Sequence, residues 1–229
     1  MGKQFEIKRE VVLPATPEQV FAAVTTGTAN WMFPTPEPAP GDPAVKVWEP
    51  PSHAAFRQED GDWFNALEYI IEARHGGTAT LRYVHSGVFT DDWDTQYDGA
   101  SKHTDFYHHT LAQYLRYFAG RDAVFVATTG PAASSTPDGV EKVKQALGIT
   151  EEGQTVRIEV PGLDPAEAVV DYLNPYFVGL RTNDALHRVF GRNHFGATVD
   201  TTHHLFGQNV DKDKTTQAWQ SWLNGVFAR

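Results

Sequence analysis

The stretch LPATPEQVFAAVT, residues 13–25, decides the fold of the N-terminal half, because the chain changes there from strand to helix within three residues. Pro14 ends the preceding strand, since proline has no N–H to donate to a sheet. Thr16 is a favourable N-cap, Pro17 stands at the first helical position, and Glu18 places a negative charge in the first turn. The buried stripe of this short helix is expected to consist of Val20, Phe21 and Val24.

The residues around this turn indicate the order of the other elements. Apolar and charged residues alternate from residue 5 to residue 13, which is typical of a half-buried strand. Three further strands are expected at residues 54–60, 63–74 and 78–89, with a tight hairpin at His75-Gly76-Gly77-Thr78. Residues 101–118 then form a long helix, whose apolar stripe consists of Tyr107, Leu111, Tyr114, Leu115 and Phe118.

The second half of the chain repeats several of these signals in the same order. TPDGVEKV at residues 136–143 resembles TPEQV at residues 16–20, and His204 precedes Leu205-Phe206 much as His85 precedes Val88-Phe89. The helix endings YLRYFAGR (114–121) and WLNGVFAR (222–229) are also similar. We interpret these matches as an internal duplication with a shortened, degenerate second copy. The alternative is that any two α/β units share such signals at the starts and ends of their elements.

The expected domains are therefore residues 1–121 and 122–229. In the second domain we expect helices at residues 137–147, 184–190 and 212–228. Its strands are expected near residues 120–131, 154–160, 167–173, 176–182 and 196–206. The sequence thus predicts an α+β fold in both halves.

Composition excludes several classes of function. The formal net charge of −10 and the absence of a basic stripe argue against a nucleic-acid or anionic membrane surface. The chain has no cysteine, which excludes disulfides, thiolate metal sites and cysteine nucleophiles. No apolar run is long enough to cross a membrane, and MGKQFEIKRE lacks the features of a signal peptide, so we expect a cytoplasmic protein.

Residues 5–120 resemble the START-like (SRPBCC) superfamily, in particular its branch related to the activator of the heat-shock chaperone ATPase. FEIKREVVLPATPEQVFAAVT at the start and TATLRYVHSGVF at residues 78–89 carry the resemblance. In the final helix, where this branch has Gly-Trp, the chain has Phe106-Tyr107. The resemblance implies a helix-grip fold, in which a curved antiparallel sheet wraps around the long C-terminal helix and leaves a cavity between them.

This resemblance implies binding of a small apolar or amphipathic molecule in that cavity. Two alternatives stay open: a module that interacts with a chaperone or another regulatory protein, and a cofactor-free cyclase or hydrolase. Neither the Gly-x-Ser-x-Gly elbow nor a glycine-rich phosphate loop occurs, so no catalytic residue and no cofactor is predicted. Whether the chain is an enzyme, which ligand it takes and how many copies associate are not indicated by the sequence.

Arg9 lies between Ile7 and Val11 on the apolar face of the first strand. A buried arginine needs an acceptor, so Arg9 could hold the acidic group of an amphipathic ligand. Alternatively, a bulge turns it outward, or it pairs internally with Glu68 or Glu72.

Tyr69, Tyr83 and His85 lie on the central strands, and Tyr107 and Leu111 lie on the long helix that the resemblance places over them. If Tyr83 and His85 point to the concave face, they supply the few polar groups of an apolar binding site. His85 could also be a structural residue or a general acid or base. With Arg9, these five residues form the predicted ligand site.

Two clusters of histidines in the sequence could contribute to a metal site. Asp105 and His109 are four residues apart and share a helix face, but His103 and His108 diverge, so a solvated helix start is the preferred interpretation. His203 and His204 are neighbours on a strand and point to opposite faces, so they cannot chelate together. No metal site is predicted.

Overall fold

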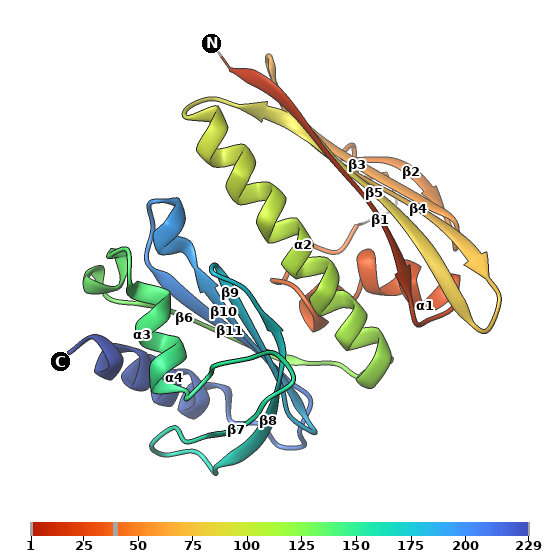
Figure 1. The fold of residues 1–229 in the computed structure, drawn as a ribbon. Coiled ribbons are helices and arrows are strands. Elements are labelled where there is room, and N and C mark those ends of the chain that lie inside the picture. Colours follow the sequence, from red (N-terminus) through yellow and green to blue (C-terminus); the bar gives the residue numbers. More distant parts are fainter. Residues whose placement is uncertain (1, 39–40, 229) are drawn as a thin grey trace. The chain divides into compact units, whose positions relative to one another are not determined.

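A computed structural model describes residues 2–38 and 41–228 (Figure 1). The chain forms two compact units, Met1–Gly120 and Arg121–Arg229, which we call unit 1 and unit 2. Each unit has its own antiparallel sheet and its own helices, as expected for an α+β fold.

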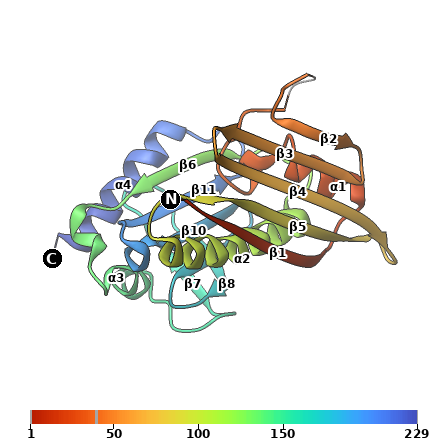
Figure 2. The same ribbon diagram turned by 90° about the horizontal axis from the view of Figure 1, so that it is seen from above.

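Unit 1 has five strands, two α-helices and one 3-10 helix. Its elements are β1 (Lys3–Leu13), α1 (Pro17–Val24), η1 (Thr28–Asn30), β2 (Val45–Glu49), β3 (His53–Asp60), β4 (Trp63–Arg74), β5 (Thr78–Phe89) and α2 (Trp93–Tyr117). The strands pair antiparallel in the order β1-β5-β4-β3-β2, which can be followed across the sheet in Figure 2. The long helix α2 lies along one face of this sheet and packs against β1 and α1 (Figure 1). This arrangement is the helix-grip fold that the sequence predicted.

The turn from β1 to α1 has the predicted chemistry. The Thr16 hydroxyl accepts the N–H of Gln19 at 3.4 Å, and the Gln19 side chain accepts the N–H of Thr16 at 3.0 Å. This capping box satisfies two of the N–H groups that a helix start leaves without partners. Val20, Phe21 and Val24 are buried as expected, so α1 is fixed against the sheet through its apolar stripe.

The long helix begins earlier than the sequence indicated, at Trp93 rather than residue 101. Residues 93–100 lack the apolar stripe of the later turns, so their periodicity did not reveal a helix. In the structure the rings of Trp93 and Tyr97 stack with centroids 4.8 Å apart, one helical turn from each other, and Lys3 of β1 lies 3.7 Å over the Trp93 ring. Contacts with β1 therefore stabilise a turn that the local pattern does not specify.

Unit 2 has six strands, with helices that correspond in order to those of unit 1. Its elements are β6 (Val124–Thr129), η2 (Ala132–Ser135), α3 (Gly139–Ala146), β7 (Thr155–Ile158), β8 (Ala166–Leu173), β9 (Phe177–Arg181), β10 (Ala185–Gly191), η3 (Arg192–Phe195), β11 (Val199–Leu205) and α4 (Lys212–Phe227). The sheet order is β6-β11-β10-β9-β8-β7. In both units the first strand pairs with the last one, and the remaining strands follow as a meander.

Unit 2 is shorter than unit 1, but no element of the helix-grip order is missing from it. The reduction lies in element lengths: α4 has 16 residues where α2 has 25. The matching sequence phrases fall on corresponding elements, since TPEQV opens α1 and TPDGV opens α3, while His85 and His204 lie on β5 and β11. Val20 and Val140, which match within these phrases, are both fully buried.

The helix expected at residues 184–190 is wrong, because this segment is strand β10. All seven residues of β10 are buried, including His187 and Arg188. A strand without exposed positions lacks the alternation that distinguishes a strand from a helix. The sequence pattern therefore did not distinguish this strand from a short helix.

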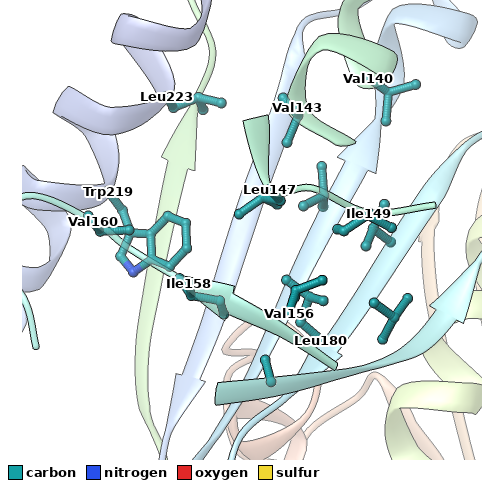
Figure 3. Close-up of a cluster of buried hydrophobic side chains, with 14 of the residues drawn as sticks. Val140, Val143, Leu147, Ile149, Val156, Ile158, Val160, Leu180, Trp219 and Leu223 are labelled. Carbon is teal, nitrogen blue, oxygen red and sulfur yellow. The ribbon is translucent and has the colours of Figure 1, made fainter. Parts of the chain in front are cut away.

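Unit 2 has a densely filled apolar core on one side of its sheet (Figure 3). Trp219 and Leu223 of α4 meet Val140 and Val143 of α3 there, above residues of β7 to β9. α4 also packs against β6, and α3 packs against β10. The two helices together thus cover this face of the sheet.

Candidate ligand-binding cavity

Unit 1 encloses a cavity of about 540 Å³ between the sheet and α2. β3, β4, β5, α1, α2 and the segment after η1 contribute to its wall. Its aromatic lining consists of Trp31, Phe33, Phe56, Tyr69, Tyr83 and Tyr107, and the stripe from α2 consists of Ala100, His103, Thr104, Tyr107, His108 and Leu111. A largely apolar cavity of this size with a few polar groups is the usual form of a small-molecule site.

The register of the sheet explains how the strand residues meet at this cavity. Tyr83 of β5 is opposite Tyr69 of β4, and His85 is opposite Leu67. Because side chains on a strand alternate between faces, Tyr83 and His85 share the inner face, as do Leu67 and Tyr69. The Tyr69 and Tyr83 rings lie with centroids 5.5 Å apart.

His85 has a defined tautomer. Its Nε2 lies 2.7 Å from the side-chain oxygen of Asn65, which can only accept a hydrogen bond. Burial lowers the pKa of His85 to about 4, so the ring is neutral at pH 7. Nε2 therefore carries the single ring proton, and Nδ1 has a lone pair that accepts no hydrogen bond from the described residues. Phe5, edge-on at 4.9 Å, holds the ring in place.

His108 of α2 is the most unusual residue of the site. It is 7% exposed, and its buried Nδ1 has no hydrogen-bond partner among the described residues. Its ring packs edge-on against Tyr83 at 4.7 Å, and burial lowers its pKa to about 4. A buried polar nitrogen without a partner costs free energy in the empty site, so His108 is a position where a ligand gains by supplying the missing hydrogen bond.

Two tyrosine hydroxyls are further polar groups of the lining, which also includes Gln58, Asn65 and several threonines. Burial raises the pKa of both Tyr69 and Tyr83, so both are neutral phenols. Tyr83 bonds to the hydroxyl of Thr104, whereas the Tyr69 hydroxyl has no partner among the described residues. Both tyrosines therefore offer uncharged hydrogen-bonding groups to the cavity.

Arg9 does not line this cavity. Its guanidinium forms a two-point contact with Asp105 of α2, at 2.5 Å from Nε and 3.2 Å from Nη2, and it also donates to the Ser101 hydroxyl at 2.8 Å. The pairing with Glu68 or Glu72 suggested by the sequence is therefore wrong: those residues pair with His53 and Arg82. Arg9 faces α2 because β1 packs against this helix, and it ties strand to helix.

The cationic residue that does line the cavity, Arg57, is already paired. Its Nε donates to Glu59 at 2.7 Å, and its guanidinium lies 3.8 Å over the ring of Phe64. With Arg57 paired to Glu59, and with His85 and His108 neutral, these three residues offer no unpaired positive charge that would select an acidic ligand, and the lining also includes the carboxylate of Asp42.

Five of the six residues predicted for the site, Tyr69, Tyr83, His85, Tyr107 and Leu111, line the cavity. Whether they contact a ligand stays a prediction. His108 was not included in that set, although its spacing could have revealed it. It lies three residues before Leu111, on the helical stripe that includes Tyr107 and Thr104. Together with its neighbours His103 and His109, it was interpreted in the sequence as part of a candidate metal site or a solvated helix start instead.

The described residues contain no group of three His, Asp or Glu side chains that could hold a metal ion. Within the same residues, no helix is long and apolar enough to span a membrane. His203 does not act with His204. It bonds to His187, with 2.8 Å between the Nδ1 atoms of the two rings.

No protein-family model and no curated protein matches this chain. Among solved structures, DynU16, a protein in the dynemicin biosynthetic locus, is 16% identical, covers 97% of this chain and 96% of its own, and has a TM-score of 0.40. The di-domain ARO/CYC StfQ from the steffimycin biosynthetic pathway is 11% identical, with 97% of each chain covered and a TM-score of 0.34. The Aha1 dimer from Colwellia psychrerythraea is 14% identical over 48% of this chain and 96% of its own, with a TM-score of 0.39.

These similarities concern the fold alone. The helix-grip assignment rests on the strand order and on the position of α2 along the sheet. On that basis the resemblance to START-like proteins is confirmed at the level of the fold.

Proposed function

We propose that unit 1 binds a small, neutral, largely aromatic molecule in the cavity between its sheet and α2. The observation that carries this proposal is His108, a buried imidazole without a hydrogen-bond partner that borders a cavity of about 540 Å³. Burial of apolar ligand surface against the aromatic lining supplies affinity, and His108, His85 Nδ1 and the Tyr69 hydroxyl fix orientation.

The charge of the site favours a neutral ligand over the acidic ligand considered from the sequence. Arg9 is engaged with Asp105, and Arg57 with Glu59. A carboxylate placed in the cavity loses its hydration without gaining a free cation, which is unfavourable.

Binding is better supported than acid–base catalysis. A general base works best when its pKa lies near the working pH, and burial holds the pKa of His85 and His108 at about 4. A cavity also distinguishes a ligand-binding unit from an interaction module, which requires an exposed apolar patch instead of internal space.

The test is a fluorescence titration of the full chain with the neutral probe N-phenyl-1-naphthylamine. We expect saturable binding that Ala100→Trp abolishes, because Ala100 of α2 lines the cavity and the indole fills it. Thr95→Trp is the matched control, since it adds the same ring at an exposed position of α2 outside the lining. Failure of the wild-type chain to bind the probe, or equal loss in both variants, would contradict the proposal.

A further inference from the structure

Unit 2 has a cavity of its own, of about 220 Å³, at the start of α4. Its interior is apolar, with side chains from β7, β8, β10, β11 and α4. The residues concerned are Ile158, Val160, Leu163, Ala166, Ala185, Leu205, Val210 and Trp219. Since an apolar cavity of about 150 Å³ accommodates benzene, this one has room for a one- or two-ring molecule.

His187 of β10 supplies a polar group inside this cavity. It is 8% exposed, and its Nδ1 lies 2.8 Å from Nδ1 of His203 on β11. Its second nitrogen, Nε2, has no partner among the described residues. Trp219 stacks on His203 with centroids 4.1 Å apart, which holds both rings in position.

The histidine pair continues into a buried hydrogen-bond chain. His203 Nε2 lies 2.9 Å from the Thr201 hydroxyl, which lies 2.7 Å from that of Thr128. Neutral imidazoles and hydroxyls can donate in either direction along such a chain. If the protons point one way, Nε2 of His187 accepts; if they point the other way, it donates. The cavity can therefore satisfy either a hydroxyl or a carbonyl at its inner end.

The mouth of the same cavity is acidic. Asp164, Asp184 and Asp211 line it and are exposed, and among the described lining residues there is no lysine or arginine. Asp211 is the N-cap of α4 and accepts the N–H of Lys214 at 3.0 Å, which compensates the positive end of the helix dipole. Lys212 and Lys214 follow on α4 but do not contribute to the lining.

We propose that unit 2 contains a second, separate binding site, for a small aromatic molecule with a protonated amine at one end and a hydroxyl or carbonyl group at the other. The aromatic body occupies the apolar interior, the hydrogen-bonding group meets His187 Nε2, and the ammonium remains at the mouth beside the three aspartates. The cation keeps part of its hydration there, so it avoids the cost of a buried charge.

Four compounds with one aromatic body test this proposal by calorimetric titration of the full chain. Tyramine carries both groups, 2-phenylethylamine lacks the hydroxyl, 4-ethylphenol lacks the amine, and 3-(4-hydroxyphenyl)propionate reverses the charge. We expect tyramine to bind tightest, loss of either group to weaken binding by about fivefold, and the propionate to bind weakest. Equal affinities for tyramine and the propionate would overturn the proposal.

Substitutions assign the binding to this cavity. Asp164→Asn is expected to weaken tyramine binding by about threefold and to leave 4-ethylphenol binding unchanged. Asp213→Asn removes the same charge from an exposed position of α4 outside the lining and is the matched control. If both variants weakened tyramine binding equally, a specific role of the aspartates at the cavity mouth would be contradicted.

A second pair of variants separates the two cavities. Ala166→Trp fills the mouth in unit 2 and is expected to abolish tyramine binding, whereas Ala100→Trp in unit 1 is expected to leave it intact. The opposite result would place tyramine in unit 1 and refute the second site. Because Ala166 is only partly buried, its substitution is compatible with folding, which a thermal unfolding curve of each variant checks.

Discussion

Unit 1 and unit 2 place a last helix over an antiparallel sheet in the same order of elements, yet they leave very different internal spaces. In unit 1 the 25-residue α2 lies along strands of up to twelve residues, and the cavity measures about 540 Å³. In unit 2 the 16-residue α4 lies over strands of at most eight residues, and the cavity measures about 220 Å³.

The side chains under the last helix explain this difference. Trp219 and Leu223 of α4 pack into a cluster with the valines of α3, which occupies part of the space under α4. On α2 the positions that face the cavity include the small residues Ala100 and Thr104 and the histidines. Topology alone therefore does not decide how much ligand a helix-grip unit can hold. Element length and side-chain volume decide it.

The two units also differ in the hydrogen bonding of their buried histidines. In unit 2, His187 and His203 bond to each other, and His203 continues to Thr201. In unit 1, the buried Nδ1 of His108 has no hydrogen-bond partner among the described residues. His187 keeps its second nitrogen, Nε2, without a partner among the described residues, so each unit retains a buried imidazole nitrogen that a ligand could satisfy; only in unit 2 is that histidine also part of a histidine–threonine network.

Among the predictions that compare the two units, acidification is expected to have the largest effect on stability. Burial holds the pKa of His85 and His108 at about 4 and that of His187 at about 3, and it lowers the pKa of His203 well below 6.5. The folded chain then binds fewer protons than the unfolded chain below about pH 6.5. Stability is therefore complete above that pH and is lost as the pH falls toward 4, by up to about 2 kcal/mol per histidine at pH 5.

Hydrogen exchange measured at pH 7 and pH 5 follows the two units separately, through the amides of β4 and β5 and those of β10 and β11. His75→Gln, in the exposed hairpin between β4 and β5, removes a histidine that lines neither cavity and is the control. A unit whose protection is equal at the two pH values would not contain neutral buried histidines.

Matched truncations of the last helices are expected to give the next largest effect. Leu223 and Leu111 are both fully buried, but Leu223 lies in a filled cluster, whereas Leu111 borders a cavity. Leu223→Ala should lower the free energy of unfolding by about 3 kcal/mol, and Leu111→Ala by about 2 kcal/mol or less, because fewer van der Waals contacts are lost beside open space. Urea unfolding measures both. A larger loss for Leu111→Ala would mean that unit 1 is as tightly packed as unit 2.

Replacing one histidine in each unit should change stability in opposite directions. His203→Phe leaves His187 Nδ1 and the Thr201 hydroxyl without their partner and should cost about 2 kcal/mol. His108→Phe removes a nitrogen that already lacks a partner and should raise the free energy of unfolding by about 1 kcal/mol. Urea unfolding curves compare the two, with His108→Gln as the variant that keeps a polar group. Destabilisation by His108→Phe would show that His108 serves the fold.

Much of the fold could be predicted from local patterns. The capping signals at Thr16 and Pro17 and the alternation in β1, β3, β4 and β5 depend on neighbouring residues, so they are visible in the sequence. The prediction was wrong at β10, where full burial removes the alternation, and it placed the start of α2 too late, where Trp93 contacts β1. In both places contacts with distant segments outweigh the local pattern.

The candidate site shows the same difference between features that depend on neighbouring residues and features that depend on contacts with distant segments. Period-two counting along β5 correctly placed Tyr83 and His85 on one face, because that depends on the strand alone. The partner of Arg9 could not be deduced, since Asp105 lies 96 residues away on a helix whose rotation over the sheet is set by packing. Nor could the sequence distinguish His108, without a partner, from His203, within a network.

The sequence by itself determined the order of most strands and helices, β10 excepted, and the resemblance between the halves, because caps, turns and periodicity act between neighbouring residues. Only the tertiary structure decided which polar groups remain unsatisfied and how much space is left beneath α2 and α4. Both quantities depend on side chains brought together from several strands and a helix, and on whether their combined volume fills the space that the backbone encloses.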